Sequence, residues 1–285
     1  MRKTIENKTY DCERALYNLI NTDVRKCTFA GPADGESALK ECSGIKVQDC
    51  SFSLRYPLWH AENFSLENSV LDEKTRAPLW YCSNGKISGC TIDGVKTLRE
   101  CGGITVENCS VRSPEFGWRC NEVKILNSSI ESEYFLFECK NITADKLKMS
   151  GKYSFQYVEN AELKNCNLNT KDAFWHCKNI TVKNSVIKGE YLAWYSDGLT
   201  LINCEIIGTQ PLCYCKNLKL INCTMRECDR AFEYSDVDAD VIGHIDSVEN
   251  PRSGKIVADS IGEVILRNAA VNCSAVVKTR KKNAV

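Results

Sequence analysis

The sequence has few of the residues on which several common functions depend. Histidine occurs only three times in 285 residues, as His60, His176 and His244, far from one another along the chain. The sequence therefore gives no support to a Ser-His-Asp or Cys-His catalytic arrangement. Lysine plus arginine balances aspartate plus glutamate at 37 each, so no excess charge attracts nucleic acid or an anionic membrane. We expect neither as a partner.

Long apolar segments are also missing. No stretch approaches the roughly 20 apolar residues that a membrane span needs. Residues 1–19 are polar and charged and lack the apolar core of a secretory signal. We therefore expect a cytoplasmic protein.

What the sequence does contain is a repeat of nineteen residues. Its core reads Cys-x-Asn-Ile-x-Val-x-Asn-Cys-x-Ile, where x is any residue. The first position of this core recurs at a constant step of nineteen at Cys82, Cys101, Cys120, Cys139, Val158, Cys177, Ser196 and Cys215. Looser copies begin at Leu19, Cys42, Ala61 and Ser235. A unit this short cannot bury its own apolar face and must stack on its neighbours, which indicates a solenoid.

The repeat predicts an all-β fold. Ile180 and Val182 alternate with Thr181 and Lys183, as in a strand with one buried face. Nineteen residues hold about three short strands and three bends, with no room for a helix. We predict a single-stranded right-handed parallel β-helix of about 11 to 12 coils, with three short strands per coil.

The repeat also sets the expected domain organisation. We expect one β-helix domain over residues 1–270, in which residues 1–18 form an N-terminal cap and residues 235–270 a C-terminal cap. Residues 271–285 are expected to be a flexible tail. Two stretches that lengthen the repeat, Ala30 to Ser37 and Leu71 to Arg76, are expected to be loops.

Asparagine marks two bends in each unit. The phase of Asn179 holds glycine in some copies, such as Gly103 and Gly198, and both residue types tolerate the left-handed conformation of a sharp turn. The phase of Asn184 is also mostly asparagine, and stacked asparagines can hydrogen-bond along a solenoid as a ladder.

The 18 cysteines fall mainly in two phases of the repeat, illustrated by Cys101 and Cys109. Residues in one phase stack about 4.8 Å apart with parallel side chains, which does not suit a disulfide. The seven-residue gap between the two phases is not a usual zinc spacing. We therefore expect reduced, small apolar fillers, and neither a metal nor another cofactor.

The third strand of each coil is apolar on both faces. One face carries Trp59, Trp80, Trp118, Trp175 and Trp194. The other carries Leu79, Leu98, Leu136, Phe155, Phe174 and Phe232. Strict alternation assigns eight charged residues to the Leu/Phe face and three to the Trp face, and unpaired buried charges are costly. We predict that the Leu/Phe face is exposed; otherwise a row of tryptophans lies on the surface.

One row beside the Leu/Phe stripe holds the candidate site. Glu100 and Glu138 are two coils apart, which permits an acid/base pair on either side of Arg119. The same three residues also fit a purely structural ion ladder. Candidate substrate-binding residues in this row are Tyr81, Arg119, Tyr157, His176 and Tyr195. Elsewhere, Asp236, Asp238 and Asp240 are a weak calcium candidate that also fits a solvated cap.

Several segments outside the repeat core carry a family resemblance. They are Glu13-Arg14-Ala15-Leu16, Pro57-Leu58-Trp59, Lys171-Asp172-Ala173-Phe174-Trp175, Gly189-Glu190-Tyr191-Leu192 and Ser247 to Ile256. The chain resembles domain-of-unknown-function family 3737, in the pectin-lyase-like superfamily of right-handed β-helices. The resemblance implies the fold and a bacterial source, and no reaction. The Asp-Asp and Gly-His-Gly motifs of polygalacturonase-like enzymes are missing.

Two classes of function remain open. The first is a non-catalytic scaffold that uses the exposed aromatic and apolar stripe to bind a carbohydrate or a protein, including a second copy in a homodimer. The second is a carbohydrate-active enzyme, either a glycoside hydrolase or a polysaccharide lyase, with its carboxylates on the same stripe. We favour the first, because the acid/base sets of known β-helix enzymes are missing.

Overall fold

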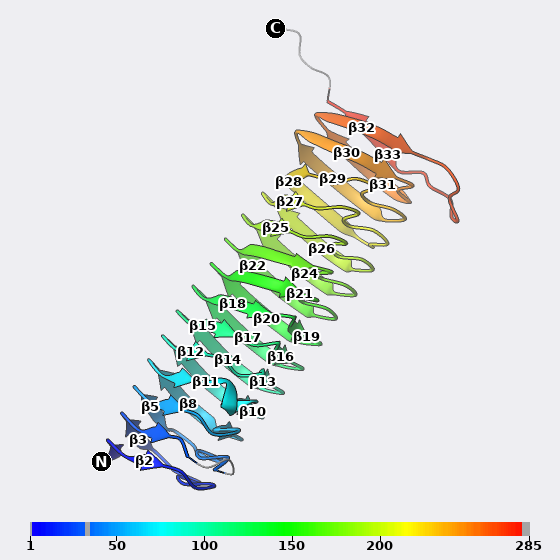
Figure 1. Cartoon of the computed structure of the whole chain (residues 1–285). Helices are drawn as coiled ribbons and strands as arrows, with labels where there is room; N and C mark the ends of the chain where they lie inside the picture. Colours follow the sequence, from blue (N-terminus) through cyan, green and yellow to red (C-terminus); the bar gives the residue numbers. More distant parts are fainter. Residues whose placement is uncertain (1, 32–34, 281–285) are drawn as a thin grey trace. The chain divides into compact units, whose positions relative to one another are not determined.

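The computed structural model describes residues 2–31 and 35–280. The chain divides into two compact units, an N-terminal unit of residues 1–148 and a C-terminal unit of residues 149–285. In each unit, every coil places its strands parallel to those of the coil before (Figure 1). The predicted parallel β-helix is therefore confirmed.

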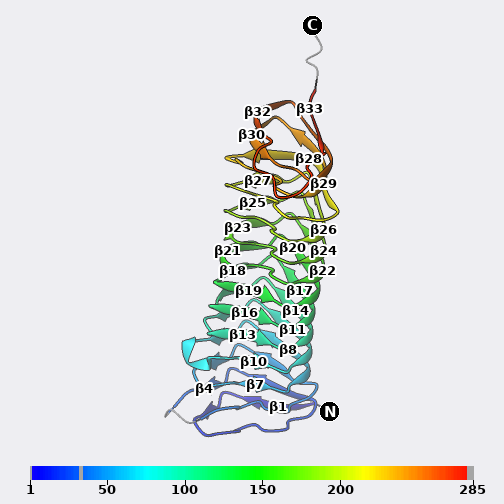
Figure 2. The same ribbon diagram turned by 90° about the vertical axis from the view of Figure 1, so that its right-hand side faces the viewer.

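The N-terminal unit contains three rows of strands, and each row runs from coil to coil. The first row comprises β1 (Lys3–Glu6), β3 (Thr22–Arg25), β5 (Lys46–Gln48), β8 (Glu62–Glu67), β11 (Ser83–Ser88), β14 (Gly102–Glu107), β17 (Asn121–Leu126) and β20 (Lys140–Asp145). The second comprises β2 (Thr9–Tyr10), β4 (Thr28–Phe29), β6 (Ser51–Phe52), β9 (Val70–Leu71), β12 (Thr91–Ile92), β15 (Ser110–Arg112) and β18 (Ser129–Ser132). The third is a separate sheet of β7 (Leu58–Trp59), β10 (Leu79–Trp80), β13 (Lys96–Arg99), β16 (Glu115–Trp118) and β19 (Tyr134–Phe137) (Figure 2).

The C-terminal unit contains rows of the first two kinds. Its first row comprises β22 (Glu159–Lys164), β24 (Lys178–Lys183), β26 (Asp197–Ile202), β28 (Leu218–Arg226), β29 (Asp236–Ile242), β31 (Ser253–Ala258) and β33 (Val276–Thr279). Its second comprises β23 (Asn167–Lys171), β25 (Val186–Lys188) and β27 (Glu205–Ile207), the last of which pairs with the end of β28. β30 (His244–Glu249) and β32 (Ser260–Ile265) form a small parallel sheet. The remaining strand, β21 (Lys148–Lys152), spans the sequence boundary between the units.

The repeat produces this arrangement because equal phases lie in register. In the first row Ile87 is opposite Val106, and Val182 is opposite Leu201, so one buried aliphatic residue sits on the next. The two predicted bends also form. Asn179 and Asn184 have φ of 55° and 50°, and the amide of Asn203 donates to the Asn184 oxygen at 3.1 Å, as expected of a ladder.

The structure has more coils than the sequence predicts. Eight strands follow one another in the first row of the N-terminal unit and seven in that of the C-terminal unit. The difference arises at the ends. β1 lies within the expected N-terminal cap, yet it pairs in parallel with β3, and β33 lies within the expected tail and pairs with β31. Both segments carry an inward apolar residue, Ile5 and Val277, that extends the column. Residues 281–285 of the expected tail lie outside the described residues.

The expected loops interrupt the register where the repeat is longer. Val24 pairs with Val47, and Leu66 with Ile87, so each insertion adds residues between stacked positions. The second insertion forms the short 3-10 turn η1 (Glu73–Thr75). Residues 32–34 of the first loop lie outside the described residues. In the described part of the chain, no helix has the length and apolar composition that crossing a membrane would require.

The predicted exposure of the third side of the coil is wrong. The Leu/Phe stripe is inside: Leu79, Leu98 and Phe174 are completely buried, and the tryptophans lie outward and half-buried. The cause is a backbone that does not alternate like a strand. Positive φ recurs within this side, for example at Leu98 (60°) and Glu100 (50°). This backbone turns three of the charged residues, Glu100, Arg119 and Glu138, to the solvent at a corner. Their charges therefore do not indicate whether the Leu/Phe face is exposed or buried.

The number of strands per coil differs along the chain. Strands form the third side of the coil from β7 to β19. Before β7 this side is a turn, at residues 13–18 and 38–41. In the C-terminal unit it is again a turn up to residue 214, and every second residue there has positive φ, as at Asp172 (54°), Phe174 (59°) and His176 (54°). β30 returns to this side near the C-terminal end, since Val248 is bridged to Ala231. Three strands per coil therefore describes the coils from β7 to β19, and two strands plus a turn describes most of the other described coils.

The cysteines pack as expected. All 18 are free thiols, and only Cys12 and Cys273 are not buried. Burial raises the pKa of the Cys42 and Cys50 thiols to about 11, which disfavours the reactive thiolate.

Candidate binding groove

All the predicted site residues lie at one corner of the coil, directly before the first-row strand. We call these positions the corner row: Glu41, His60, Tyr81, Glu100, Arg119 and Glu138 in the N-terminal unit, and Tyr157, His176, Tyr195 and Tyr214 in the C-terminal unit. Each has a positive φ between 50° and 62°. This conformation is sparsely populated by residues other than glycine, asparagine and aspartate, and here it turns bulky side chains outward at every coil. The structure brings the site residues together in two groups, one in each unit.

In the C-terminal unit the corner row is a continuous stack of rings. Tyr157 stacks on His176 with centroids 5.0 Å apart, His176 on Tyr195 at 5.0 Å, and Tyr195 on Tyr214 at 4.7 Å. The planes deviate by 6°, 6° and 11°. Tyr157 and Tyr195 are 46 % and 48 % exposed, so the stack is a surface feature and not part of the core.

A pocket of about 440 Å³ lies along this stack. The four rings line it, and so does one charged side chain from the start of each first-row strand or the bridge that replaces it. These charged residues are Glu159, Lys178, Asp197 and Lys216. The charges alternate in sign from coil to coil, and Lys178 approaches Glu159 at 3.7 Å. We call this open pocket, lined by rings and by charges of both signs, the groove.

The stacking limits how this groove can contact a ligand. Both faces of His176 and of Tyr195 are covered by the neighbouring rings. The idea that sugar faces stack on these rings is therefore not supported, because the faces are already used. What the rings offer is their edges, phenolic hydroxyls and imidazole nitrogens, repeated at the spacing of the coils. Tyr214 donates its hydroxyl to Glu233 at 2.9 Å, and burial together with this bond raises its pKa.

The N-terminal unit places Tyr81, Glu100, Arg119 and Glu138 on successive coils. Tyr81 stacks on His60 at 5.0 Å and is 39 % exposed. Arg119 donates its Nε–H to Glu138 at 2.7 Å, and this bond raises the pKa of the guanidinium. The two candidate catalytic carboxylates thus flank an arginine that is already ion-paired with one of them, which is the geometry of a structural ladder. A smaller pocket of about 280 Å³ lies further along this corner, beside Glu41, His60 and Glu62.

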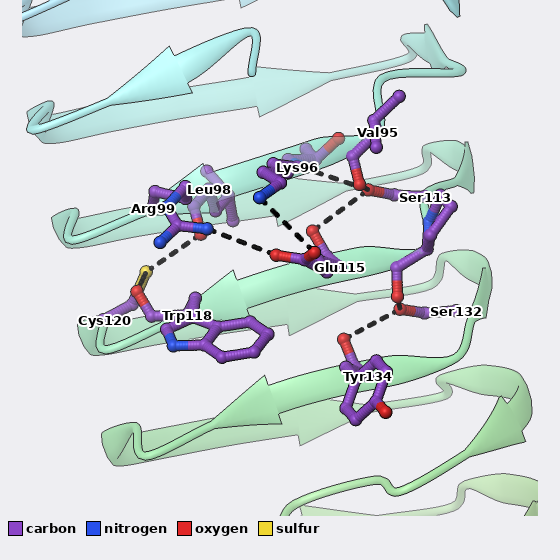
Figure 3. A network of polar contacts seen from close by, with 12 residues as sticks. Val95, Lys96, Leu98, Arg99, Ser113, Glu115, Trp118, Cys120, Ser132 and Tyr134 are labelled. Carbon is purple, nitrogen blue, oxygen red and sulfur yellow. Dashed lines mark hydrogen bonds and ion pairs between the residues drawn. The ribbon is translucent and has the colours of Figure 1, made fainter. Parts of the chain in front are cut away.

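A second surface row, beside the corner row, was assigned to the interior from the sequence. In the N-terminal unit this row holds Trp59, Trp80, Arg99 and Trp118 on successive coils. Trp59 stacks on Trp80 at 5.5 Å, and the Arg99 guanidinium lies 5.5 Å from the ring centroids of both Trp80 and Trp118. Arg99 also donates to Glu115 at 3.2 Å, which Lys96 approaches at 3.5 Å (Figure 3). Cation–π contacts and ion pairs hold this row, so its ring faces are occupied as well.

The matching row in the C-terminal unit uses carbonyl groups instead of cations. Trp175 and Trp194 stack at 5.4 Å, and their indole N–H groups donate to Tyr191 O and Gln210 O at 2.6 and 2.8 Å. The signal for this row was present in the sequence as five tryptophans in one phase. The sequence does not indicate that these tryptophans face outward, because their direction depends on the positive φ of neighbouring residues.

Two of the three aspartates considered for calcium pair with arginines of the protein itself. Asp236 accepts from Arg252, with Nε to Oδ1 at 2.7 Å, and Asp240 pairs with Arg280. Within residues 2–31 and 35–280, no cluster of three or more His, Cys, Asp or Glu side chains could hold a metal ion.

Comparison with protein families settles the relationship of the chain. Residues 3–278 match the family described as "Protein of unknown function (DUF3737)". The chain belongs to this family. No curated protein matches the DUF3737 chain.

Comparison with solved structures finds similar chains at low identity to this DUF3737 chain. The surface adhesin PfbA of Streptococcus pneumoniae has a TM-score of 0.50 and 10 % identity, over 82 % of this chain and 85 % of that one. The A-module of mannuronan C-5 epimerase AlgE4 from Azotobacter vinelandii has a TM-score of 0.36 and 9 % identity, over 97 % of this chain and 91 % of that one. The catalytic domain of a GH87 α-1,3-glucanase in complex with nigerose has a TM-score of 0.35 and 10 % identity, over 98 % of this chain and 63 % of that one. At these identities the likeness concerns the fold alone.

Proposed function

We propose that this DUF3737 chain is a non-catalytic binding module that holds an extended carbohydrate along the groove of its C-terminal unit. One observation carries the proposal: an exposed column of ring edges and hydroxyls, from Tyr157 to Tyr214, borders a pocket of about 440 Å³. Side chains repeat along this column once per coil. A ligand with repeating units of similar length would meet the same kinds of group at each step.

The chemistry of the groove suits a polyhydroxylated ligand. Tyrosine hydroxyls donate and accept hydrogen bonds, carboxylates accept them and ammonium groups donate them, so both functions of a sugar hydroxyl find partners. A shallow, open groove also suits the contact with a chain that enters and leaves along the surface. The surface adhesin that resembles the chain adds no more than an analogy of fold.

Affinity measurement on a panel of polysaccharides tests the proposal. We expect at least one linear glycan to bind the intact chain, and Tyr195→Ala to weaken that binding by about tenfold, because stacking partners and a hydroxyl are lost together. Tyr81→Ala is the matched control, since Tyr81 is a similarly exposed tyrosine in the same row of the N-terminal unit. Absence of binding across the panel would sink the proposal, as would equal losses in both variants.

The same panel tests the enzymatic alternative. Release of reducing or unsaturated ends, lost in both Glu100→Gln and Glu138→Gln, would establish catalysis in the N-terminal unit and replace our proposal. The ion pair between Arg119 and Glu138 does not favour that result, because the Glu138 carboxylate is already engaged by the guanidinium at 2.7 Å.

We further propose that the protein works in a reducing compartment such as the bacterial cytoplasm. The 18 free thiols support this, and cell fractionation tests it. The homodimer that the sequence leaves open depends on an exposed Leu/Phe stripe, and the burial of that stripe removes the argument for it. Light scattering of the purified chain measures the oligomeric state directly.

A further inference from the structure

The charge pattern of the groove narrows the class of carbohydrate. We infer that the groove of the C-terminal unit selects an uncharged linear glycan and discriminates against acidic ones. This inference rests on the proposed function. It adds the chemical class of the carbohydrate, which we derive from four charged residues of the groove and not from the rings.

The four charges form a neutral, alternating ladder. In the first row Glu159 is opposite Lys178, Lys178 is opposite Asp197, and Asp197 is bridged to Lys216. Each lysine therefore has an acidic residue as its neighbour in the groove, and the formal charges of the four cancel.

The acidic members are engaged with neighbouring side chains. Glu159 accepts the contact from Lys178 at 3.7 Å, and Asp197 accepts a hydrogen bond from Asn217 at 2.8 Å. These contacts hold the carboxylates at the groove and keep negative charge beside each lysine.

A polyanion fits this ladder poorly. With one carboxylate per sugar along the coil direction, every second carboxylate would lie beside Glu159 or Asp197, and like charges repel at such distances. At Lys178 the attraction of a ligand carboxylate would be offset by the loss of the ion pair with Glu159. Hydroxyl groups face no such conflict, because they hydrogen-bond to either sign of charge.

Two substitutions in the groove should reverse this selectivity. Converting both acids to amides, in Glu159→Gln with Asp197→Asn, keeps the side-chain shapes and leaves Lys178 and Lys216 uncompensated. Glu62→Gln is the matched control, since Glu62 holds the same position in the N-terminal unit, outside this groove.

The experiment compares hexasaccharides by titration calorimetry at two salt concentrations. The probes are neutral hexose oligomers of several linkages, a uronate oligomer, and an oligomer in which uronate and neutral sugars alternate. We expect the neutral class to bind most tightly with little dependence on salt. In the double variant we expect uronate affinity to rise by about tenfold and to become sensitive to salt, whereas Glu62→Gln changes neither.

Each outcome separates the inference from the proposal on which it rests. If the wild-type chain prefers the uronate or the alternating oligomer, the inference is overturned and carbohydrate binding stands. Unchanged selectivity in the double variant also overturns it, because the charges would then have no part in recognition. If no oligomer binds, the proposed function itself fails.

Discussion

The backbone N–H of Cys101 donates a hydrogen bond to the Sγ of Cys120, one coil further along, at 3.4 Å. The thiol of Cys120 in turn lies 3.4 Å from the carbonyl oxygen of Leu98. A hydroxyl takes the same part elsewhere, since Ser128 accepts from the amide of Cys109 at 3.1 Å. The small side chain at the bend therefore bonds a buried backbone amide, which is a polar role beyond the packing expected from the sequence.

This role predicts a difference between two substitutions at one position. Cys120→Ala removes the acceptor and leaves the buried amide of Cys101 unpaired, so we expect a loss of about 1–3 kcal/mol in the free energy of unfolding. Cys120→Ser retains an acceptor and should lose less. Guanidinium unfolding followed by circular dichroism gives both values, and Cys12→Ser at the exposed thiol is the control. Equal losses for alanine and serine would show that the thiol acts by volume alone.

The buried Leu/Phe stripe makes a second prediction. Phe174 is completely buried and stacks on Phe155 at 4.7 Å, so Phe174→Ala should cost about 3–5 kcal/mol of unfolding free energy. Phe174→Leu should cost less than about 1.5 kcal/mol, because leucine fills the equivalent place in the N-terminal unit. Thermal melting measures both. Trp175→Ala, on the outward face, should cost less than Phe174→Ala, and the reverse order would contradict the buried stripe.

The Leu/Phe stripe also shows which features of the fold could be predicted from the sequence and which could not. Register followed directly from the nineteen-residue step, because equal phases must stack in a solenoid, and Ile180 and Val182 marked the buried face of their strand. The direction of Phe174 did not follow, because alternation applies to extended backbone only. Bulky residues such as His176 and Tyr195 adopt positive φ at the corner, and no propensity of those residue types indicates it.

For the candidate site too, part of the arrangement could be predicted from the sequence and part could not. The shared phase of Tyr157, His176 and Tyr195 sufficed to place them in one column, and the structure confirms that they stack. That they line one pocket with Lys178 and Asp197 could not be predicted, because it depends on how far the corner turns. Nor did the sequence reveal that Arg119 would bond Glu138 and not Glu100, a choice between two equal neighbours.

The burial of the cysteines predicts their reactivity. At pH 8 we expect Ellman's reagent to modify Cys12 quickly and Cys273 more slowly, because these are the two thiols that are not buried. The others should react only after unfolding, since burial excludes the reagent and raises the pKa of thiols such as Cys42 and Cys50 to about 11. Cys12→Ser should abolish the fast phase. Rapid modification of many thiols in the folded chain would show that the stacks are open to solvent.

Two aspartates of the C-terminal unit should respond to pH with opposite signs. Hydrogen bonds from Arg252 lower the pKa of Asp236 below its unfolded value of about 3.9, so its contribution is present above that pH and is lost as pH falls through the folded pKa. Burial instead raises the pKa of Asp172, so its ionisation opposes folding as pH rises through the raised pKa. At pH 7, Asp236→Asn should therefore destabilise the chain, by up to about 1 kcal/mol because the pair is part-exposed.

Asp172→Asn should stabilise the chain at pH 7, or at least not destabilise it, because the amide has no charge to desolvate. Urea midpoints measured between pH 3 and pH 7 separate the two effects. The difference between wild type and Asp236→Asn should shrink toward the acid end, because the unfolded chain takes up the proton at a higher pH than the folded chain does. For Asp172→Asn the difference should also shrink there, but from the stabilised side. Curves for both variants that run parallel to wild type over this range would mean that neither carboxyl changes its pKa on folding.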